Sequence, residues 1–193
     1  FQAENLLMAA LLVIASGQNE KKIFGILENV RPVRGRMELA ATRKNGATVY
    51  VDYAHTPDAI EVALKSLKPH ILGKLIIIIG AGGERDEGKR PLMGQAAEKN
   101  SDFVIITDDN PRNEDPSLIH QMIKNGIQDN SKVRVIADRA EAILTAVDLL
   151  EIGDGLLIAG KGHETEQFIG ENVFPFDDFE QASLSVASLD GVE

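Results

Sequence analysis

The 193-residue sequence contains no cysteine and no tryptophan, and its basic residues are fewer than its acidic residues. Without cysteine, the chain can form neither disulfide bonds nor thiolate metal sites. Its 20 Lys and Arg residues against 30 Asp and Glu residues give a formal net charge of −10. This charge argues against a nucleic-acid partner, because nucleic-acid binding needs a basic surface.

Long hydrophobic runs are also missing from the sequence. The apolar stretch at residues 6–15 is too short to span a bilayer, and the first residues lack the basic region of a signal peptide. We therefore expect a cytoplasmic protein without a membrane partner. No residues have the spacing of zinc ligands, and no Ser-His-Asp or Cys-His arrangement is visible. Hydrophobic residues make up 44% of the chain, which is typical of a globular domain.

The sequence changes character near residue 34. Residues 5–16 and 23–30 have helical patterns, and Gly17 is a typical helix terminator. The run Arg31-Pro32-Val33-Arg34 then breaks the pattern and is typical of a linker. We therefore predict a boundary between residues 1–34 and residues 35–193.

Beyond this linker, strand-like and helical segments alternate. The Asn45-Gly46 turn predicts a hairpin of strands at 37–43 and 48–52. Apolar strands are predicted at 75–79, 103–107, 133–137 and 156–159, and helices at 57–67, 91–99, 117–126 and 139–150. A short hairpin around Gly170 and a helix at 179–189 follow. Because strands without polar alternation are covered on both faces, we predict an α/β fold: a Rossmann-like, mostly parallel sheet with helices on both faces and an N-terminal hairpin.

Polar, glycine-rich segments follow several predicted strands. They occupy residues 52–57, 80–91, 108–112 and 160–164. Ligands of parallel sheets bind at the carboxyl ends of the strands. We therefore expect these segments to form one site, in which a common cleft is faced by Arg85, Asn110, Arg112 and Glu164.

The segment at 80–91 contains two incomplete nucleotide-binding patterns. Gly80-Ala81-Gly82 begins like a dinucleotide-binding turn, but Arg85 occupies the third glycine position, which disfavours a dinucleotide-dependent oxidoreductase. Residues 83–89 have P-loop spacing, yet Arg90 replaces the metal-binding Ser or Thr, and three carboxylates would repel phosphates. Two interpretations stay open: the loop presents Arg85 to an anion, or it is a solvated charged loop.

The segment at 108–112 has the residue types of an amino-acid site. Arg112 can pair with a carboxylate, and Asn110 can both donate to and accept from an amino-acid head group. The alternative is a turn in which Arg112 only braces its own loop against Asp109 or Glu114.

The segment at 160–164 also carries candidate ligand-binding groups. Glu164 can hold an ammonium group, while Lys161 and His163 could neutralise phosphate charge. The alternative is a surface turn. His55 precedes a predicted helix N-terminus, where anions are favoured, or it has a local capping role.

Together, the four segments occur in the order and spacing of one family, and nearly the whole chain resembles the Mur ligases. The run Asp-Asn-Pro-Arg at 109–112 resembles the diaminopimelate-adding members. The resemblance implies that residues 1–34 are the C-terminal tail of the central ATPase domain plus a linker. Residues 35–193 would then be the C-terminal, amino-acid-binding domain.

The resemblance also implies an activity for the longer protein. It would be an ATP-dependent, amide-bond-forming ligase of peptidoglycan synthesis, adding meso-diaminopimelate to UDP-N-acetylmuramoyl-L-alanyl-D-glutamate through an acyl phosphate. ATP and magnesium would be bound mainly by the central domain, whose P-loop is not in this sequence, and the protein would be a monomer. The alternatives are a lysine-adding Mur ligase, which Arg112 disfavours, and a stand-alone binding module without catalysis.

Finally, the resemblance implies roles for individual residues. Asn5 would lie near the adenine, Arg36 would reach an ATP phosphate, and Asp52 would reach the ribose. Tyr53 and His55 would contact the edge of the nucleotide. The diaminopimelate would be held by Arg85, Asn110, Pro111, Arg112, Gly160 and Glu164. The resemblance implies no catalytic residue and no metal ligand in this chain.

Overall fold

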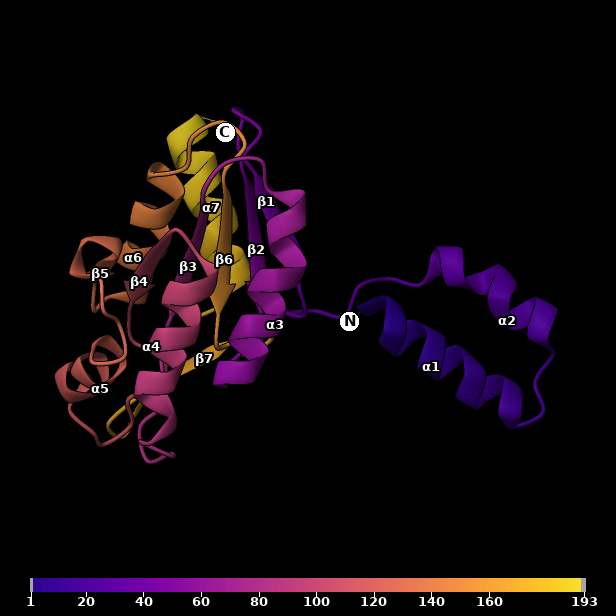
Figure 1. Cartoon of the computed structure of the whole chain (residues 1–193), viewed down its shortest axis with the longest axis horizontal. Helices are drawn as coiled ribbons and strands as arrows, with labels where there is room; N and C mark the ends of the chain where they lie inside the picture. Colours follow the sequence, from indigo (N-terminus) through magenta and orange to yellow (C-terminus); the bar gives the residue numbers. More distant parts are fainter. Residues whose placement is uncertain (1, 192–193) are drawn as a thin grey trace. The chain divides into compact units, whose positions relative to one another are not determined.

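The computed structural model describes residues 2–191 and divides the chain into two compact units, Phe1–Val33 and Arg34–Glu193. The first unit contains α1 (Gln2–Ala15), α2 (Glu20–Ile26) and the short 3₁₀ helix η1 (Leu27–Asn29) (Figure 1). The second helix begins three residues earlier than the predicted 23–30 because the Asn19 side chain caps it, accepting a hydrogen bond from the backbone N–H of Lys22.

The second unit is built on a six-stranded sheet with the strand order β1-β2-β6-β3-β4-β5. Strand β1 is antiparallel to β2, and all other neighbouring strands are parallel. The prediction of a mostly parallel sheet with an N-terminal hairpin is therefore confirmed. The strands are β1 (Glu38–Thr42), β2 (Thr48–Asp52), β3 (Leu75–Ile79), β4 (Phe103–Ile106), β5 (Val133–Val135) and β6 (Gly155–Ala159).

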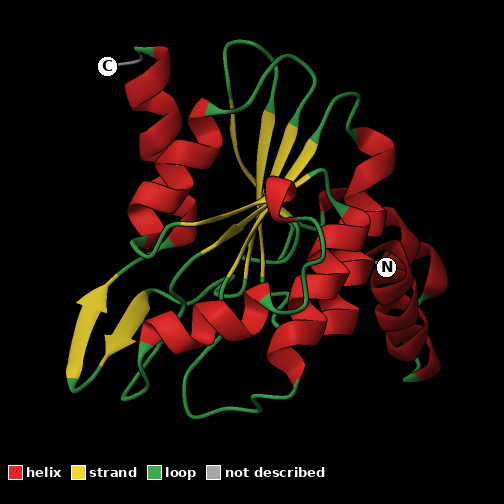
Figure 2. Ribbon diagram, turned by 60° about the vertical axis from the view of Figure 1, so that its left-hand side comes forward, coloured by secondary structure: helices red, strands yellow, loops and turns green. Residues whose placement is uncertain are grey.

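Helices cover both faces of this sheet, as predicted (Figure 2). One face carries α3 (Pro57–Leu67), α4 (Lys89–Asn100) and α5 (Pro116–Lys124), and the other carries α6 (Arg139–Asp148) and α7 (Asp178–Asp190). Every residue of β3 and β6 is buried. In β3, Leu75, Ile77 and Ile79 face the core under α3–α5, while the alternate residues Ile76 and Ile78 face α6 and α7. The 3₁₀ helices η2 (Lys68–His70) and η3 (Asn130–Lys132) complete the connections.

Helix starts in this unit are set by side-chain caps. The hydroxyl of Thr56 accepts from the N–H of Ala59, which confirms the predicted start of α3 at Pro57. Asp115 caps α5, Asp138 caps α6 and Asp177 caps α7 in the same way. None of the helices in the described part of the chain is long and apolar enough to cross a membrane.

A second, two-stranded sheet stands apart from the main sheet (Figure 2). Its strands β7 (Glu166–Ile169) and β8 (Asn172–Pro175) form the hairpin that was predicted around Gly170. Every residue of β8 is exposed. Strand β7 instead contacts the chain after β4, where the backbone N–H of Arg112 donates to the carbonyl of Phe168.

A buried ion pair joins α6 and α7, which lie on the same face of the sheet. Arg139 of α6 and Asp178 of α7 are both fully buried, and two hydrogen bonds of 2.7 Å connect them. The same guanidinium donates to the carbonyl of Ala159, at the end of β6, and to the carbonyl of Asp108, after β4. One arginine therefore fixes two helices and the ends of two strands.

Substituting Arg139→Met should strongly destabilise the domain, because it leaves the Asp178 carboxylate buried without its partner. We expect a loss of about 3–5 kcal/mol in the free energy of unfolding, measured by chemical denaturation. The control is Lys68→Met, which removes an ion pair with Asp102 whose side chains are 46% and 43% exposed, and which should cost less than about 1 kcal/mol. Equal losses in the two variants would contradict this account.

Candidate functional site

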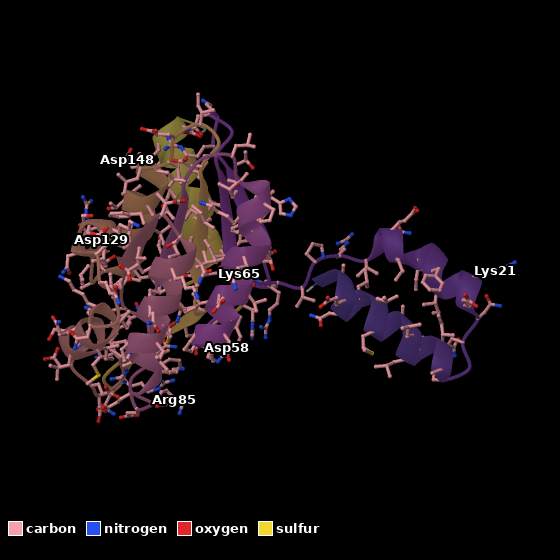
Figure 3. All side chains as sticks on the ribbon, in the orientation of Figure 1. Lys21, Asp58, Lys65, Arg85, Asp129 and Asp148 are labelled. Carbon is pink, nitrogen blue, oxygen red and sulfur yellow. The ribbon has the colours of Figure 1, made fainter. Side chains whose placement is uncertain are left out.

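The loops that follow β2, β3, β4 and β6 meet at one edge of the sheet, where they line an open pocket of about 200 Å³. Figure 3 shows Arg85 at this edge, near the end of α3 that carries Asp58. The pocket contains both signs of charge. Its cationic side chains come from Arg85, Lys89 and Arg112, and its carboxylates from Asp109 and Glu164.

The structure brings most of the expected site residues together. Of the six residues expected to bind an amino acid, all except Pro111 line the pocket. Tyr53 and His55 line it as well, whereas Arg36 and Asp52 do not. Asn5 belongs to α1 in the first unit, so its expected position near an adenine stays a prediction.

Arg112 is held by its backbone and by its side chain. Its backbone has a φ of 53°, and its carbonyl accepts a hydrogen bond from the N–H of Gly170. Its Nη1 donates to the carbonyl of Gly83 at 2.8 Å and, more weakly, to the carbonyl of Asn110 at 3.4 Å. The bracing partners are therefore carbonyl groups, not the carboxylates of Asp109 or Glu114 that the alternative named. Within residues 2–191, no hydrogen bond uses Nη2 or Nε of Arg112, and these groups can serve a ligand.

Asn110 is oriented by two donors and one acceptor. Its Oδ1 accepts from the ammonium of Lys161 at 3.1 Å and from the N–H of Phe168 at 3.0 Å, and its Nδ2 donates to Oε2 of Glu164 at 3.1 Å. Because the carbonyl oxygen already has two donors, the expectation that Asn110 accepts from a head group is corrected. Its remaining capacity toward a ligand is donation from Nδ2.

Lys161 lies in the interior of the domain. Its side chain is 0% exposed and does not line the pocket, so its expected contact with phosphate is not supported. Burial lowers the pKa of this ammonium, against the opposing influence of Asp109 and Glu164. The neighbouring His163 is exposed, with its ring centroid 5.3 Å from that of Tyr53.

Asp109 is a pocket residue to which the sequence analysis gave no ligand role. Its carboxylate lies so close to Gly160 that a Cβ on the glycine would stand 2.7 Å from Oδ2. Gly160 also has a φ of 117°, which only glycine adopts readily. The position of Asp109 in the run at 109–112 was a usable signal, because a carboxylate beside Asn110 suits an ammonium group.

Asp52 holds the turn at the start of the second unit, which carries Arg36. The Asp52 carboxylate accepts from the backbone N–H groups of Met37 at 2.7 Å and of Ala54 at 2.8 Å. Burial raises the pKa of Asp52, although these two hydrogen bonds and the charge of Arg36 lower it. The guanidinium carbon of Arg36 lies 4.7 Å from the ring centroid of Tyr53, a cation–π geometry. A contact of Asp52 with ribose therefore stays a prediction, and the observed role of Asp52 is to shape the turn that carries Arg36.

The loop between β3 and α4 is fixed at its base. Buried Arg90 donates to the carbonyl of Gly82 and pairs with Glu114 at 2.8 Å. Glu114 also accepts from the backbone N–H of Glu84. Arg85 itself is exposed, at the free part of this loop. The loop therefore has a braced base and an exposed outer part from which Arg85 reaches the pocket. Binding of an anion by Arg85 stays a prediction.

The loops after β3 and β4 touch at Gly83. Its N–H donates to the carbonyl of Asn110 at 2.9 Å, and a Cβ at this position would stand 1.9 Å from the carbonyl oxygen of Pro111. Pro111 therefore contributes its backbone to the wall behind the pocket. Among residues 2–191, no group of three or more His, Cys, Asp or Glu side chains could hold a metal ion.

Known proteins resemble this chain in sequence and in fold. The family described as "Mur ligase, glutamate ligase domain" matches residues 35–162. The chain belongs to the Mur ligase family. This match contains three of the four pocket loops entirely and the first three residues of the fourth.

Similar proteins carry one recurring name. A UDP-N-acetylmuramoyl-L-alanyl-D-glutamate–2,6-diaminopimelate ligase of Bradyrhizobium diazoefficiens is 48% identical over 188 residues, covering 97% of this chain and 38% of the relative. The ligase of the same name from Rickettsia prowazekii is 52% identical over 182 residues, covering 93% of this chain and 37% of the relative. The chain therefore spans a little over a third of the length of these relatives.

Solved structures share the fold. The structure of a ligase of that same name is 38% identical, with a TM-score of 0.77, and the match covers 97% of this chain and 38% of that one. A UDP-N-acetylmuramate–alanine ligase from Thermotoga maritima has a TM-score of 0.69 at 18% identity, over 100% of this chain and 38% of its own. At that identity, the second likeness concerns the fold alone.

Substituting Gly83→Ala should separate the two loops that meet behind the pocket, because the new methyl group would overlap the Pro111 carbonyl. We expect a loss of about 1–3 kcal/mol in the free energy of unfolding, together with altered backbone amide NMR shifts at Asn110 and Arg112. The control is Gly88→Ala in the same loop, where a Cβ meets only the Asp86 side chain at 3.2 Å. If both variants leave the shifts of Asn110 and Arg112 unchanged, the contact does not hold the loops.

Proposed function

We propose that this chain is the C-terminal, amino-acid-binding domain of an ATP-dependent ligase that adds meso-diaminopimelate to UDP-N-acetylmuramoyl-L-alanyl-D-glutamate. The observation that carries the proposal is that one pocket contains both arginine and carboxylate side chains. Arg85 and Arg112 lie in the same lining as Asp109 and Glu164. Diaminopimelate has two carboxylates and two ammonium groups, so it can use both pairs.

The distal carboxylate is the group that separates diaminopimelate from lysine. Arg112 has guanidinium donors left after bracing Gly83, and a planar guanidinium can bind a carboxylate through two parallel hydrogen bonds. Arg85 supplies a second positive charge from an exposed loop, which can adjust to a ligand. Lysine offers no carboxylate at that position.

The ammonium group of the amino acid suits the carboxylate side of the pocket. Glu164 receives one hydrogen bond from Asn110, through Oε2, and within residues 2–191 no hydrogen bond uses its Oε1. Asp109 provides a second carboxylate beside Gly160. A fixed carboxylate pair orients the amine and helps to make its attack effectively intramolecular.

The proposed reaction has two steps. ATP phosphorylates the free carboxylate of the UDP-muramoyl dipeptide to an acyl phosphate, and the amine of diaminopimelate then attacks the acyl carbon and releases phosphate. The residues of this chain would bind and orient the amino acid, while Arg36, Tyr53 and His55 would contact the nucleotide. ATP and magnesium would be held mainly by a central domain, of which residues 1–34 would be the tail and linker. We expect this enzyme to work as a cytoplasmic monomer.

The chain by itself should not turn over ATP, because it contains no P-loop to hold the triphosphate. The measurement is phosphate release with ATP, magnesium, the UDP-muramoyl dipeptide and diaminopimelate. A longer ligase that contains this chain serves as the positive control. Phosphate release by the purified 193-residue chain above the no-enzyme rate would refute the assignment of catalysis to the central domain.

In the longer ligase, Arg112→Ala should reduce kcat/KM for diaminopimelate by roughly thirty-fold or more. Leaving a ligand carboxylate unpaired in a closed site costs on the order of 2–5 kcal/mol, and about 1.4 kcal/mol is tenfold in rate. Lysine should be affected much less. The control is Arg134→Ala, which removes an exposed arginine of β5 that does not line the pocket. Equal losses for both amino acids would show that Arg112 only braces Gly83, and a clear preference of the unaltered enzyme for lysine would favour the lysine-adding alternative.

A further inference from the structure

Lys161 is one of several charged side chains in this domain that are buried without lining the pocket. Lys161 follows β6 and is 0% exposed. Burying an ammonium group is costly unless every donor finds a partner. The proposed reaction gives the charge of this residue no direct contact with a substrate.

Two of the three partners of Lys161, Asn110 and Glu164, line the amino-acid pocket. Its Nζ donates to Oδ1 of Asn110 at 3.1 Å and to the carbonyl of Glu166, at the start of β7, at 2.6 Å. It also lies 3.6 Å from Oε2 of Glu164, close enough for an ion pair. A single ammonium therefore meets the loop after β4, the loop after β6 and the hairpin.

The contact with Asn110 decides which way the side-chain amide points. Both groups that face Oδ1, the Lys161 ammonium and the Phe168 N–H, are donors, so the oxygen must occupy that side. The nitrogen is then on the side of Glu164, to which it donates at 3.1 Å. A rotated amide would place an oxygen against the carboxylate of Glu164 and repel it.

We propose that Lys161 is a positioning residue of the amino-acid site: it locks the Asn110 amide so that Nδ2 holds the Glu164 carboxylate toward the ammonium group of the substrate. This inference rests on the proposed function for the identity of the ligand. The charge matters because a hydrogen bond from an ammonium is stronger than one from a neutral donor, and the Phe168 N–H alone is neutral.

The kinetic test uses the longer ligase with Lys161→Met, Asn110→Ala and the double variant. Losing the charge-assisted hydrogen bond from Lys161 to Asn110 should raise KM for diaminopimelate about ten- to hundredfold. KM for ATP should stay within about twofold. Because Lys161 acts through Asn110, the double variant should lose little more than Asn110→Ala alone. Lys68→Met, which removes a lysine that pairs with Asp102 and does not line the pocket, is the matched control.

Two results would overturn the proposal. One is an equal rise in KM for ATP and for diaminopimelate, which indicates general structural damage. The other is an additive loss in the double variant, which indicates that Lys161 acts independently of Asn110.

If the Lys161→Met protein does not fold, NMR of the unaltered 193-residue chain without ligand decides. A nuclear Overhauser effect between the Lys161 ammonium and the Phe168 amide, with slowly exchanging Asn110 side-chain protons, supports the lock. Fast exchange of those protons refutes it. This experiment involves no diaminopimelate, so it separates a failure of the positioning role from a failure of the proposed function.

Discussion

The pocket depends on an ion pair that does not line it. Arg139 and Asp178 neutralise each other inside the domain, and the remaining donors of the guanidinium hold the carbonyl groups of Ala159 and Asp108. Those two carbonyls immediately precede Gly160 and Asp109, which line the pocket. Because a buried charge tolerates little displacement of its partners, Arg139 fixes the spacing between the loops after β4 and β6. The pocket residues Gly160 and Asp109 are therefore positioned by an ion pair that does not itself line the pocket.

Much of the fold was predictable because it follows from local and periodic signals. A run of five apolar residues at 75–79 predicts a strand covered on both faces, and Thr56 before Pro57 predicts a helix start. Element ends were less predictable where the final residues bond outside the ladder. Strand β5 was expected to reach residue 137 but ends at Val135. The carbonyl of Ala137 instead accepts hydrogen bonds from the backbone N–H of Asp108 and from the hydroxyl of Thr107, in the loop after β4. Such contacts between distant segments leave no periodic trace in the sequence.

The candidate site was likewise predictable only in part. The geometry of parallel strands predicts that four side chains gather at one edge of the sheet: Arg85, Asn110, Arg112 and Glu164. Which polar residue is enclosed and which is exposed did not follow, because both kinds look alike in a polar loop. Lys161 is as hydrophilic in the sequence as Arg85, yet one is buried and the other exposed.

The hairpin outside the main sheet has a consequence for how the protein is made. The loop at 109–112 is bonded to residues of the hairpin roughly sixty positions later: Gln167 donates to the carbonyl of Asp109, and Gly170 donates to that of Arg112. The last strand of the main sheet, β6, already ends at Ala159. On a ribosome, where the N-terminal part of a chain emerges first, the sheet can pair before the loop has anything to bind to. The pocket proposed to bind an amino acid is therefore completed only after the strands that support it have emerged.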